Sequence, residues 1–185
     1  MKEDIVMTNE RQERLQNRLQ PEIAEFRNEC RTLVLATVDA DGMPNVSYAP
    51  FVQLTDGYYV LISEIARHAR NLQQVPRTSL MMIEDESQSR QLFARKRLTF
   101  DARVEKVARD TASWQEAVAA LEARHGDIVA NLSQMADFIL FRMVPEQGLY
   151  VKGFGQAFQV SSDDLVDVVH LQEGHKTVSG EPVKA

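Results

Sequence analysis

Residues 33–52 read LVLATVDADGMPNVSYAPFV, and this stretch decides the fold that the sequence predicts. An apolar run leads into the turn sequence DADG at residues 39–42, and a second extended run follows it. Asp-Gly between two β-rich runs predicts a hairpin, because glycine adopts a positive φ without steric cost. Pro44 and Pro50 lack a backbone donor, so the second strand is expected at a sheet edge or beside a bulge.

Composition narrows the class of protein. The chain has 185 residues and a net charge of −6, without a long tract of lysine and arginine. General nucleic-acid and anionic-membrane binders need a basic surface, so we expect neither partner. No stretch is long and apolar enough to span a bilayer, and the N-terminal residues lack a hydrophobic signal core. Cys30 is the only cysteine, which excludes an internal disulfide, and we expect a cytoplasmic protein.

Apolar side chains at three- and four-residue spacing predict several helices. The helical segments are residues 9–30, 64–73, about 111–125, 128–135 and 162–169. Pro21 is expected to kink the first helix or to start a new one. Ser63 and Asp110 are expected to cap the second and third helices, and Gly126 is expected to end the third.

Short apolar or alternating runs predict the strands. Besides the hairpin they lie at 58–62, 79–83, 98–104, 138–143 and 149–160, where the last run forms one or two strands. The run at 98–104 alternates apolar and polar residues, which is the period of a half-buried strand. Residues 84–90 are expected to form a loop or a short exposed helix, and residues 145–148 a turn.

Together these elements predict a single α+β domain over residues 1–185, built on an antiparallel β-barrel. Residues 9–30 form its N-terminal helix, residues 31–160 its barrel core, and residues 161–185 a short helix and a tail. No repeat or low-complexity linker divides the chain.

Four runs carry a resemblance to a known family. They are the hairpin sequence, LISEIARHARNLQQVPRTSLMMIEDE, ARKRLTFDARVEKV and GLYVKGFGQAFQVSSDDL. The chain resembles the pyridoxamine 5′-phosphate oxidase-like split β-barrels, which bind FMN, and more closely the HutZ/HugZ haem-utilisation family. The extension ending in Glu173-Gly174-His175 points to the haem branch, because flavin-using relatives generally lack it.

This resemblance implies an antiparallel split barrel that forms a homodimer with two ligand clefts at the interface. It implies haem binding and an oxygen-dependent opening of the haem ring that releases iron, with electrons from an external donor. By resemblance His175 is the axial ligand of the haem iron, and Asp137 hydrogen-bonds this imidazole across the dimer. An imidazole is an ordinary axial ligand, and a carboxylate on its other nitrogen raises its basicity. His170 is the alternative ligand, and Asp137 is alternatively a turn residue between a helix and a strand.

Cationic side chains supply candidate partners for the haem propionates. Arg67, His68 and Arg70 lie near a predicted helix start, where they suit a phosphate or carboxylate; the alternative is a solvated basic face. The other candidates are Arg95, Lys96 and Arg97, and the glycines Gly153 and Gly155, which would let a flat ligand lie close to the backbone.

Three functions remain open at the level of sequence. The first is a haem-degrading enzyme, for which a haem-delivery protein is left open as a further partner. The second is an FMN-dependent oxidoreductase, whose phosphate group Arg67, Ser79, Lys96 and Arg97 could hold. The third is a protein that stores or transfers haem without degrading it, because one fold supports all three.

Overall fold

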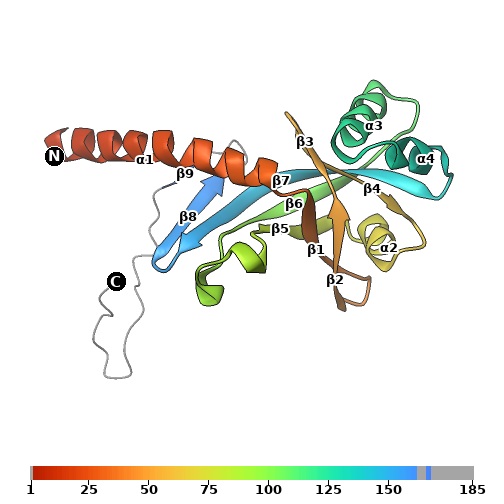
Figure 1. The fold of residues 1–185 in the computed structure, drawn as a ribbon, viewed down its shortest axis with the longest axis horizontal. Coiled ribbons are helices and arrows are strands. Elements are labelled where there is room, and N and C mark those ends of the chain that lie inside the picture. The colour runs from red at the N-terminus through yellow and green to blue at the C-terminus, as the bar shows by residue number, and fades with distance from the viewer. Residues whose placement is uncertain (1, 162–165, 168–185) are drawn as a thin grey trace. The chain divides into compact units, whose positions relative to one another are not determined.

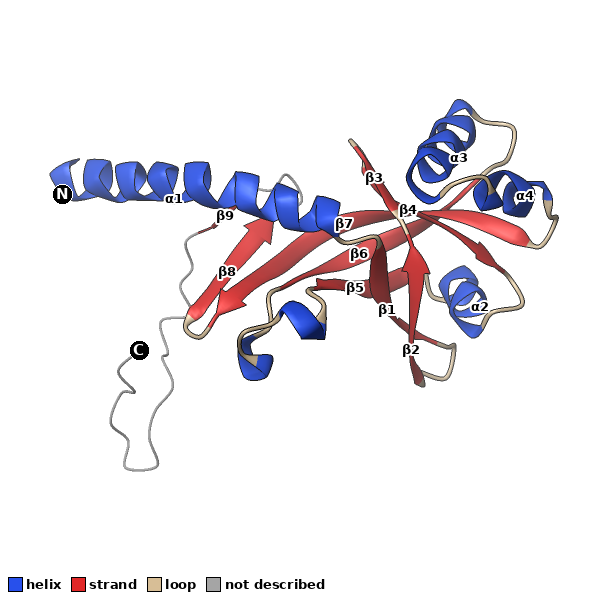
Figure 2. Cartoon of the chain, in the orientation of Figure 1, coloured by secondary structure: helices blue, strands red, loops and turns tan. Residues whose placement is uncertain are grey.

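The computed structural model describes residues 2–161 and 166–167 (Figures 1 and 2). Its helices are α1 (Lys2–Glu29), α2 (Arg67–Gln74), α3 (Ala112–His125) and α4 (Ile128–Gln134), with short 3-10 turns at Glu86–Gln88 and Leu92–Ala94. Its strands are β1 (Thr32–Val38), β2 (Pro44–Pro50), β3 (Val52–Leu54), β4 (Gly57–Ser63), β5 (Arg77–Ile83), β6 (Arg97–Val107), β7 (Phe138–Gly153), β8 (Gln156–Ser161) and β9 (Val166–Asp167). The prediction of an α+β fold on an antiparallel sheet is confirmed.

The chain folds as two units, which we describe separately. The first unit comprises Met1–Cys30, Ile83–Thr99 and Gln147–Ala185, and the second comprises Arg31–Met82 and Phe100–Glu146. The boundaries of a single domain over residues 1–185 therefore stay a prediction.

The sheet of the second unit follows the order β2-β1-β5-β6-β7-β4-β3. Strand β1 pairs antiparallel with β2 and β5, and β4 pairs antiparallel with β3 and β7. The predicted hairpin is present: Asp39 N donates to Met43 O at 3.1 Å, and Gly42 lies in the turn with φ of 82°. Pro44 and Pro50 are the end residues of β2, the terminal strand of this order, so the edge position predicted from these prolines is confirmed.

The core of the second unit arises from strand alternation and from one helix stripe. Phe100, Ala102 and Val104 are buried on β6, as their period predicts. Helix α3 buries Trp114, Ala117 and Leu121 against residues of β3, β4 and β7. Gly57 brings the start of β4 against β7, because a Cβ there would lie 2.6 Å from Met143 O. A side chain at this position would therefore push the two strands apart.

The first unit is held by the C-terminal half of α1. Leu19, Ile23 and Phe26 are buried on one face of α1, and the Phe26 ring lies 6.1 Å from the Tyr150 ring on β7. Strand β8 pairs antiparallel with the end of β7, and β9 pairs with β8. Among the described residues, no helix is long and apolar enough to cross a membrane.

Two predicted helix starts are wrong. Helix α2 begins at Arg67 rather than at residue 64, and its N-cap is Ala66 rather than Ser63. The Ser63 hydroxyl instead accepts the Ile65 N–H and donates to Asp137. Helix α3 is capped by Thr111, whose Oγ1 accepts the Trp114 N–H at 3.2 Å, and not by Asp110. Ser63 is engaged by Asp137 and the Ile65 N–H, so α2 begins without a side-chain cap, whereas Thr111 supplies the cap of α3.

Three further expectations need correction. Helix α1 starts well before residue 9 and contains Pro21, so no new helix begins at this proline; the alternative of a kink there stays a prediction. The turn expected at 145–148 does not form, because Gln147 and Gly148 pair with β8 and β7 continues through them. Val166 and Asp167, expected in a short helix, pair with β8 as β9. The long β7 could not be seen locally, since it depends on a partner strand farther along the chain.

Candidate functional site

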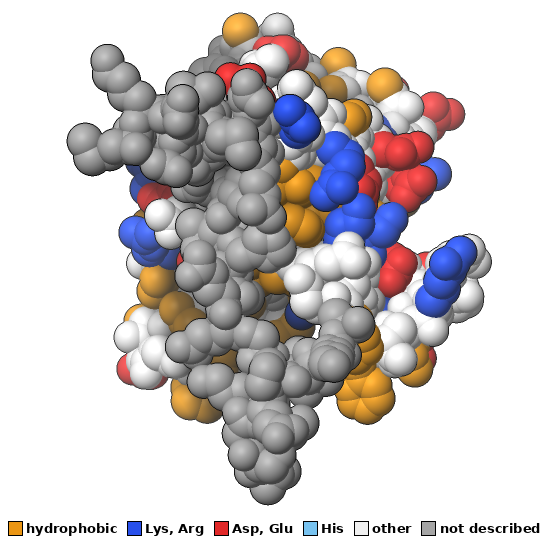
Figure 3. Space-filling view, turned by 90° about the vertical axis from the view of Figure 1, so that its left-hand side faces the viewer, with side chains coloured by type: hydrophobic (Ala, Val, Ile, Leu, Met, Phe, Trp, Pro, Cys, Tyr) orange, Lys and Arg blue, Asp and Glu red, His pale blue; other side chains and the backbone are white. Residues whose placement is uncertain are grey.

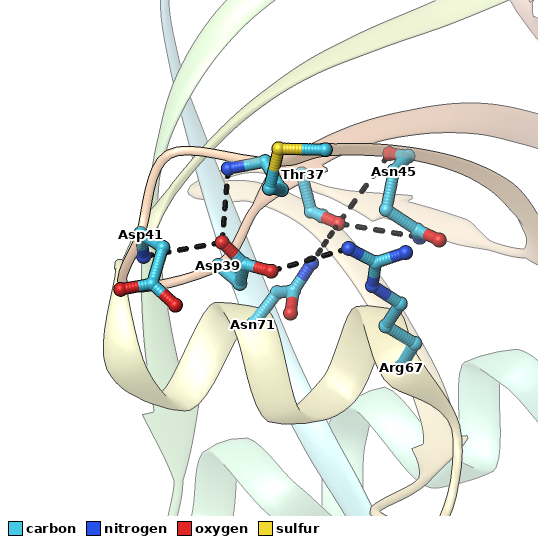
Figure 4. Close-up of polar contacts among 7 residues, drawn as sticks. Thr37, Asp39, Asp41, Asn45, Arg67 and Asn71 are labelled. Atoms are coloured by element: carbon cyan, nitrogen blue, oxygen red, sulfur yellow. Dashed lines mark hydrogen bonds and ion pairs between the residues drawn. The ribbon is translucent and has the colours of Figure 1, made fainter.

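Helix α2 and the β1–β2 hairpin form a polar cluster in the second unit (Figure 4). Arg67, the first residue of α2, donates to Asp39 Oδ2 at 3.1 Å. One turn farther on, the buried Asn71 Nδ2 donates to Thr37 Oγ1 at 3.0 Å. These two bonds hold the start of α2 against the hairpin, so the hairpin helps to fix where the Arg67 side chain lies.

The hairpin fixes Asp39, which in turn orients Arg67. Asp39 Oδ1 accepts the backbone N–H groups of Met43 at 2.9 Å and Asp41 at 3.1 Å. The Met43 N–H, together with the Arg67 guanidinium, holds the pKa of Asp39 below its usual range, although desolvation acts in the opposite direction. Arg67 remains 49% exposed at its side chain, so most of its donors are available to an anion.

His68 and Arg70 complete the cationic candidates on α2. His68 is half-buried, and burial lowers the pKa of its imidazole, which favours the neutral ring. Arg70 is exposed and donates from Nη1 to the Ile65 carbonyl, closing the segment that precedes the helix. Arg67 and Arg70 are thus brought to one short helix with exposed guanidinium groups, as the sequence predicts.

Asp137 lies between α4 and β7 in the same unit. Its Oδ2 accepts the Ser63 hydroxyl at 2.7 Å, and its carbonyl accepts the Glu64 N–H at 2.8 Å. The alternative role given to Asp137, a turn residue between a helix and a strand, is therefore present. A second role as partner of a ligand imidazole is compatible with this geometry and stays a prediction.

The cations Arg95, Lys96 and Arg97 lie in the first unit, where the loop before β6 engages them. Arg95 Nη2 donates to the Glu84 carbonyl, and Arg97 Nη1 donates to the Arg95 carbonyl at 3.1 Å. The Lys96 backbone N–H donates to Glu84 Oε1 at 2.7 Å. The Lys96 ammonium lies 5.5 Å from the centre of the Phe26 ring. Much of this charge is therefore committed to the loop and to α1.

A polar contact that the sequence did not single out joins α1 to β7 in the first unit. Glu22 Oε1 accepts the buried Tyr150 hydroxyl at 2.8 Å, and Oε2 accepts Lys152 Nζ at 2.6 Å. Burial raises the pKa of Glu22, but the two hydrogen bonds outweigh it, and the pKa lies below its ordinary value. The same burial and the Glu22 contact raise the pKa of Tyr150. No local motif marks these residues, because they are far apart in the sequence.

The remaining candidates are dispersed. Gly153 ends β7, and Gly155, with φ of 65°, lies in the turn before β8. Ser79 is exposed on β5, opposite Ala36 of β1. His170 and His175 lie outside the described residues.

The structure thus places the candidates in two groups. The α2 residues, Ser79 and Asp137 belong to the second unit, whereas residues 95–97 and the two glycines belong to the first. Sequence reasoning missed the hydrogen bond from Ser63 to Asp137 and the hydrogen bonds that Glu84 accepts from residues 95 and 96. On the face drawn in Figure 3, positive side chains lie among negative ones. Among the described residues, no group of three or more His, Cys, Asp or Glu side chains could hold a metal ion.

Comparison with known proteins defines the class first. The family model described as pyridoxamine 5′-phosphate oxidase matches residues 19–152. Solved structures with this fold include Campylobacter jejuni ChuZ, which is 29% identical with a TM-score of 0.78 and aligns over 88% of this chain and 67% of that chain. The α+β sheet is therefore the split barrel that the sequence predicts.

The relationship becomes more specific with two matches to Vibrio cholerae HutZ, one a sequence and one a solved structure. The "Heme oxygenase HutZ" of serotype O1 is 65% identical over 169 residues, which are 91% of this chain and 96% of that protein. A crystal structure of HutZ, described as a heme storage protein, is 59% identical with a TM-score of 0.70, over 72% of this chain and 94% of that chain. The chain belongs to the HutZ haem-utilisation family within the pyridoxamine 5′-phosphate oxidase-like split barrels.

Proposed function

We propose that this protein binds haem and degrades it with oxygen and external electrons, releasing iron. The observation that carries the proposal is the 65% identity, over nearly the whole of both chains, to a protein named heme oxygenase. A cytoplasmic site of action and a role in iron acquisition follow as expectations from this activity.

His175 is the proposed axial ligand of the haem iron, with His170 as the alternative. A neutral imidazole nitrogen binds the iron, and a carboxylate on the other nitrogen fixes the tautomer. Asp137 is the proposed carboxylate, supported by its fixed backbone and by one oxygen that makes no hydrogen bond to the described residues. Its role is to hold the imidazole proton and so to strengthen electron donation to the iron.

The haem propionates need cations, and the structure supports some candidates more than others. Arg67 and Arg70 are exposed, and the side chain of each makes one hydrogen bond to the described residues and keeps further donors. Arg97 is half-buried, and its side chain makes one hydrogen bond within the described part of the chain, to the Arg95 carbonyl. These three arginines are the proposed propionate partners; Arg95 and Lys96 are weaker candidates because the loop engages them.

A homodimer is proposed as the functional form. The outward face of β2 carries Val46 and Tyr48, which are 74% and 68% exposed. Ala36 and Val34 of β1 lie beside them in the sheet register and extend an apolar face. An apolar face of this kind is typical of an interface. Sedimentation at micromolar protein should give a dimer, and a stable monomer would contradict this part of the proposal.

Two alternatives keep a specific motivation. A haem storage protein is favoured by the description of the Vibrio cholerae crystal structure, which names storage rather than degradation. An FMN-dependent oxidoreductase is favoured by the family model, since flavin-using members share this fold. The same exposed arginines would serve an FMN phosphate.

One experiment separates the three functions. The purified protein is titrated with haemin and, separately, with FMN, and the haem complex is then mixed with oxygen and a reductant. Degradation is expected as loss of the Soret band with release of iron to a chelator. A Soret band that survives turnover conditions indicates storage, and binding of FMN without haem indicates the oxidoreductase.

The ligand is tested by His175→Ala, with His170→Ala as the matched control. The His175 variant should bind haem more weakly and shift the Soret band, whereas the control should retain the wild-type spectrum. Haem binding should also weaken on acidification, because a protonated imidazole cannot bind iron. A wild-type spectrum for His175→Ala would assign the iron ligand to another residue.

A further inference from the structure

The contact between Ser63 and Asp137 joins two corners of the second unit. Ser63 is the last residue of β4 and lies opposite Phe138 in the β4–β7 register, next to Asp137. Its Oγ lies 2.7 Å from Asp137 Oδ2. The Ser63 hydroxyl donates this hydrogen bond, and the Asp137 oxygen accepts it.

The hydroxyl of Ser63 has a fixed direction. Its oxygen also accepts the Ile65 backbone N–H at 3.2 Å, which occupies one lone pair. The single hydroxyl proton is then left for Asp137. The Ser63 side chain therefore does not rotate freely between partners, and the carboxylate is held from one defined side.

Asp137 is tethered at its backbone as well. Its carbonyl accepts the Glu64 N–H at 2.8 Å, and the Ser63 carbonyl accepts the Ala66 N–H at 3.0 Å. Two adjacent residues between β4 and α2 thus bind Asp137: the Ser63 hydroxyl bonds to its side chain, and the Glu64 N–H bonds to its carbonyl. The half-buried carboxylate is oriented before any ligand binds.

The other carboxylate oxygen remains available. Asp137 Oδ1 makes no hydrogen bond or ion pair within the part of the chain that the structure describes. With Oδ2 satisfied, Oδ1 is the atom left to accept a proton donor from outside.

We propose that Ser63 is the positioning residue that holds Asp137 for its contact with the imidazole of the haem ligand. This inference rests on the proposed function and deepens it. The Ser63 hydroxyl fixes Oδ2, so that Oδ1 accepts the imidazole N–H in one orientation. The strength of electron donation from the imidazole to the iron then depends on Ser63, although Ser63 touches neither group.

The test compares Ser63→Ala, Ser63→Thr and Asp137→Asn as haem complexes. Ser133→Ala is the matched control, because the buried Ser133 hydroxyl donates to the Ala130 carbonyl near the same corner without touching Asp137. The readout is the iron–imidazole stretching band of the ferrous complex in resonance Raman spectra, together with haem affinity and turnover. Outer partners of metal ligands change activity about 10–100-fold, which is the loss expected for Asp137→Asn.

Ser63→Ala should shift the iron–imidazole band in the same direction as Asp137→Asn, by a smaller amount. Turnover should fall about two- to tenfold, the usual worth of one hydrogen bond. Ser63→Thr and Ser133→Ala should keep the wild-type band. Adding Ser63→Ala to Asp137→Asn should change nothing further, because Ser63 acts through the Asp137 carboxylate.

A wild-type band in Ser63→Ala, beside a shifted band in Asp137→Asn, would overturn the role of Ser63 and leave the proposed function intact. A wild-type protein that fails to bind haem would instead overturn the proposed function, and this inference with it. If Ser63→Ala does not fold, Ser63→Cys replaces it, because a thiol is a weak donor. An intermediate band shift is then expected, and an unchanged band would again contradict the inference.

Discussion

The two cationic groups look alike in sequence and differ in the structure. In the second unit, Arg67 and Arg70 each use one side-chain donor in a contact with the described residues and remain exposed. In the first unit, Arg95 is only 23% exposed at its side chain and is bound to the loop backbone, with Glu86 3.8 Å away. Charge alone therefore does not show which cations are free to bind a ligand. The hydrogen bonds that each cation already makes within the protein show it.

This comparison predicts that Arg95 matters for stability, whereas Arg67 and Arg70 matter for ligand binding. A buried or half-buried cation that holds backbone carbonyls costs stability when it is removed. An exposed ion pair costs little, because water screens it. Substitutions at Arg95, Glu22 and Arg67, together with Asp39→Asn, test the difference, beginning with the largest expected loss of stability.

Arg95→Met should lower the free energy of unfolding by about 1.5–3 kcal/mol, because a charge-assisted hydrogen bond to the Glu84 carbonyl is lost while the side-chain stem is kept. Urea denaturation measures the change. Arg90→Met is the matched control, because Arg90 is exposed in the same loop. Equal stability of the two variants would show that Arg95 is no more committed to the fold than its exposed neighbour.

The Glu22 contact should give the next largest effect, and it should depend on pH. The pKa of Glu22 in the folded protein lies below its ordinary value of 4.5. A lowered pKa contributes stability above that value, and this stability is lost as the pH falls through the folded-state pKa. Glu22→Gln should therefore reduce the free energy of unfolding by about 1–2 kcal/mol at neutral pH.

Below the ordinary glutamate pKa the difference between wild type and Glu22→Gln should shrink, because the wild-type carboxylate is then protonated as well. Urea denaturation at a series of pH values measures this convergence. Glu25→Gln, at an exposed position of the same helix, is the control and should change little. A constant difference at all pH values would mean that Glu22 acts through packing and not through its charge.

Whether a contact can be predicted from the sequence depends on how far apart its two residues lie along the chain. The hairpin at 33–52 and the alternation at Phe100 and Ala102 were predicted because turn chemistry and strand period are local signals. Arg67 and Arg70 are predicted for the same reason, because they lie three residues apart on one short helix. The Ser63–Asp137 bond joins residues 74 positions apart, and the Tyr150–Glu22 bond joins residues 128 apart. No local pattern reveals such pairs, so the sequence alone predicts Ser63 as a helix cap and does not reveal its bond to Asp137.

The smallest change in stability is expected for Arg67→Ala, and it is also the sharpest test of the comparison. The Arg67–Asp39 pair is exposed, so its loss should leave the free energy of unfolding nearly unchanged. Haem affinity should fall by more, about tenfold, because a charge-assisted bond to a propionate is worth roughly 1.5 kcal/mol or more.

Asp39→Asn separates these two effects, because it releases Arg67 from its ion pair but leaves the guanidinium in place. It should keep or increase haem affinity, since Arg67 no longer has to leave a protein carboxylate in order to bind a propionate. Urea denaturation and haemin titration of both variants give the two quantities. If Arg67→Ala lost stability and kept full haem affinity, the roles of the two cationic groups would be the reverse of those proposed. Arg67 would then belong with Arg95 among the cations that the fold itself requires.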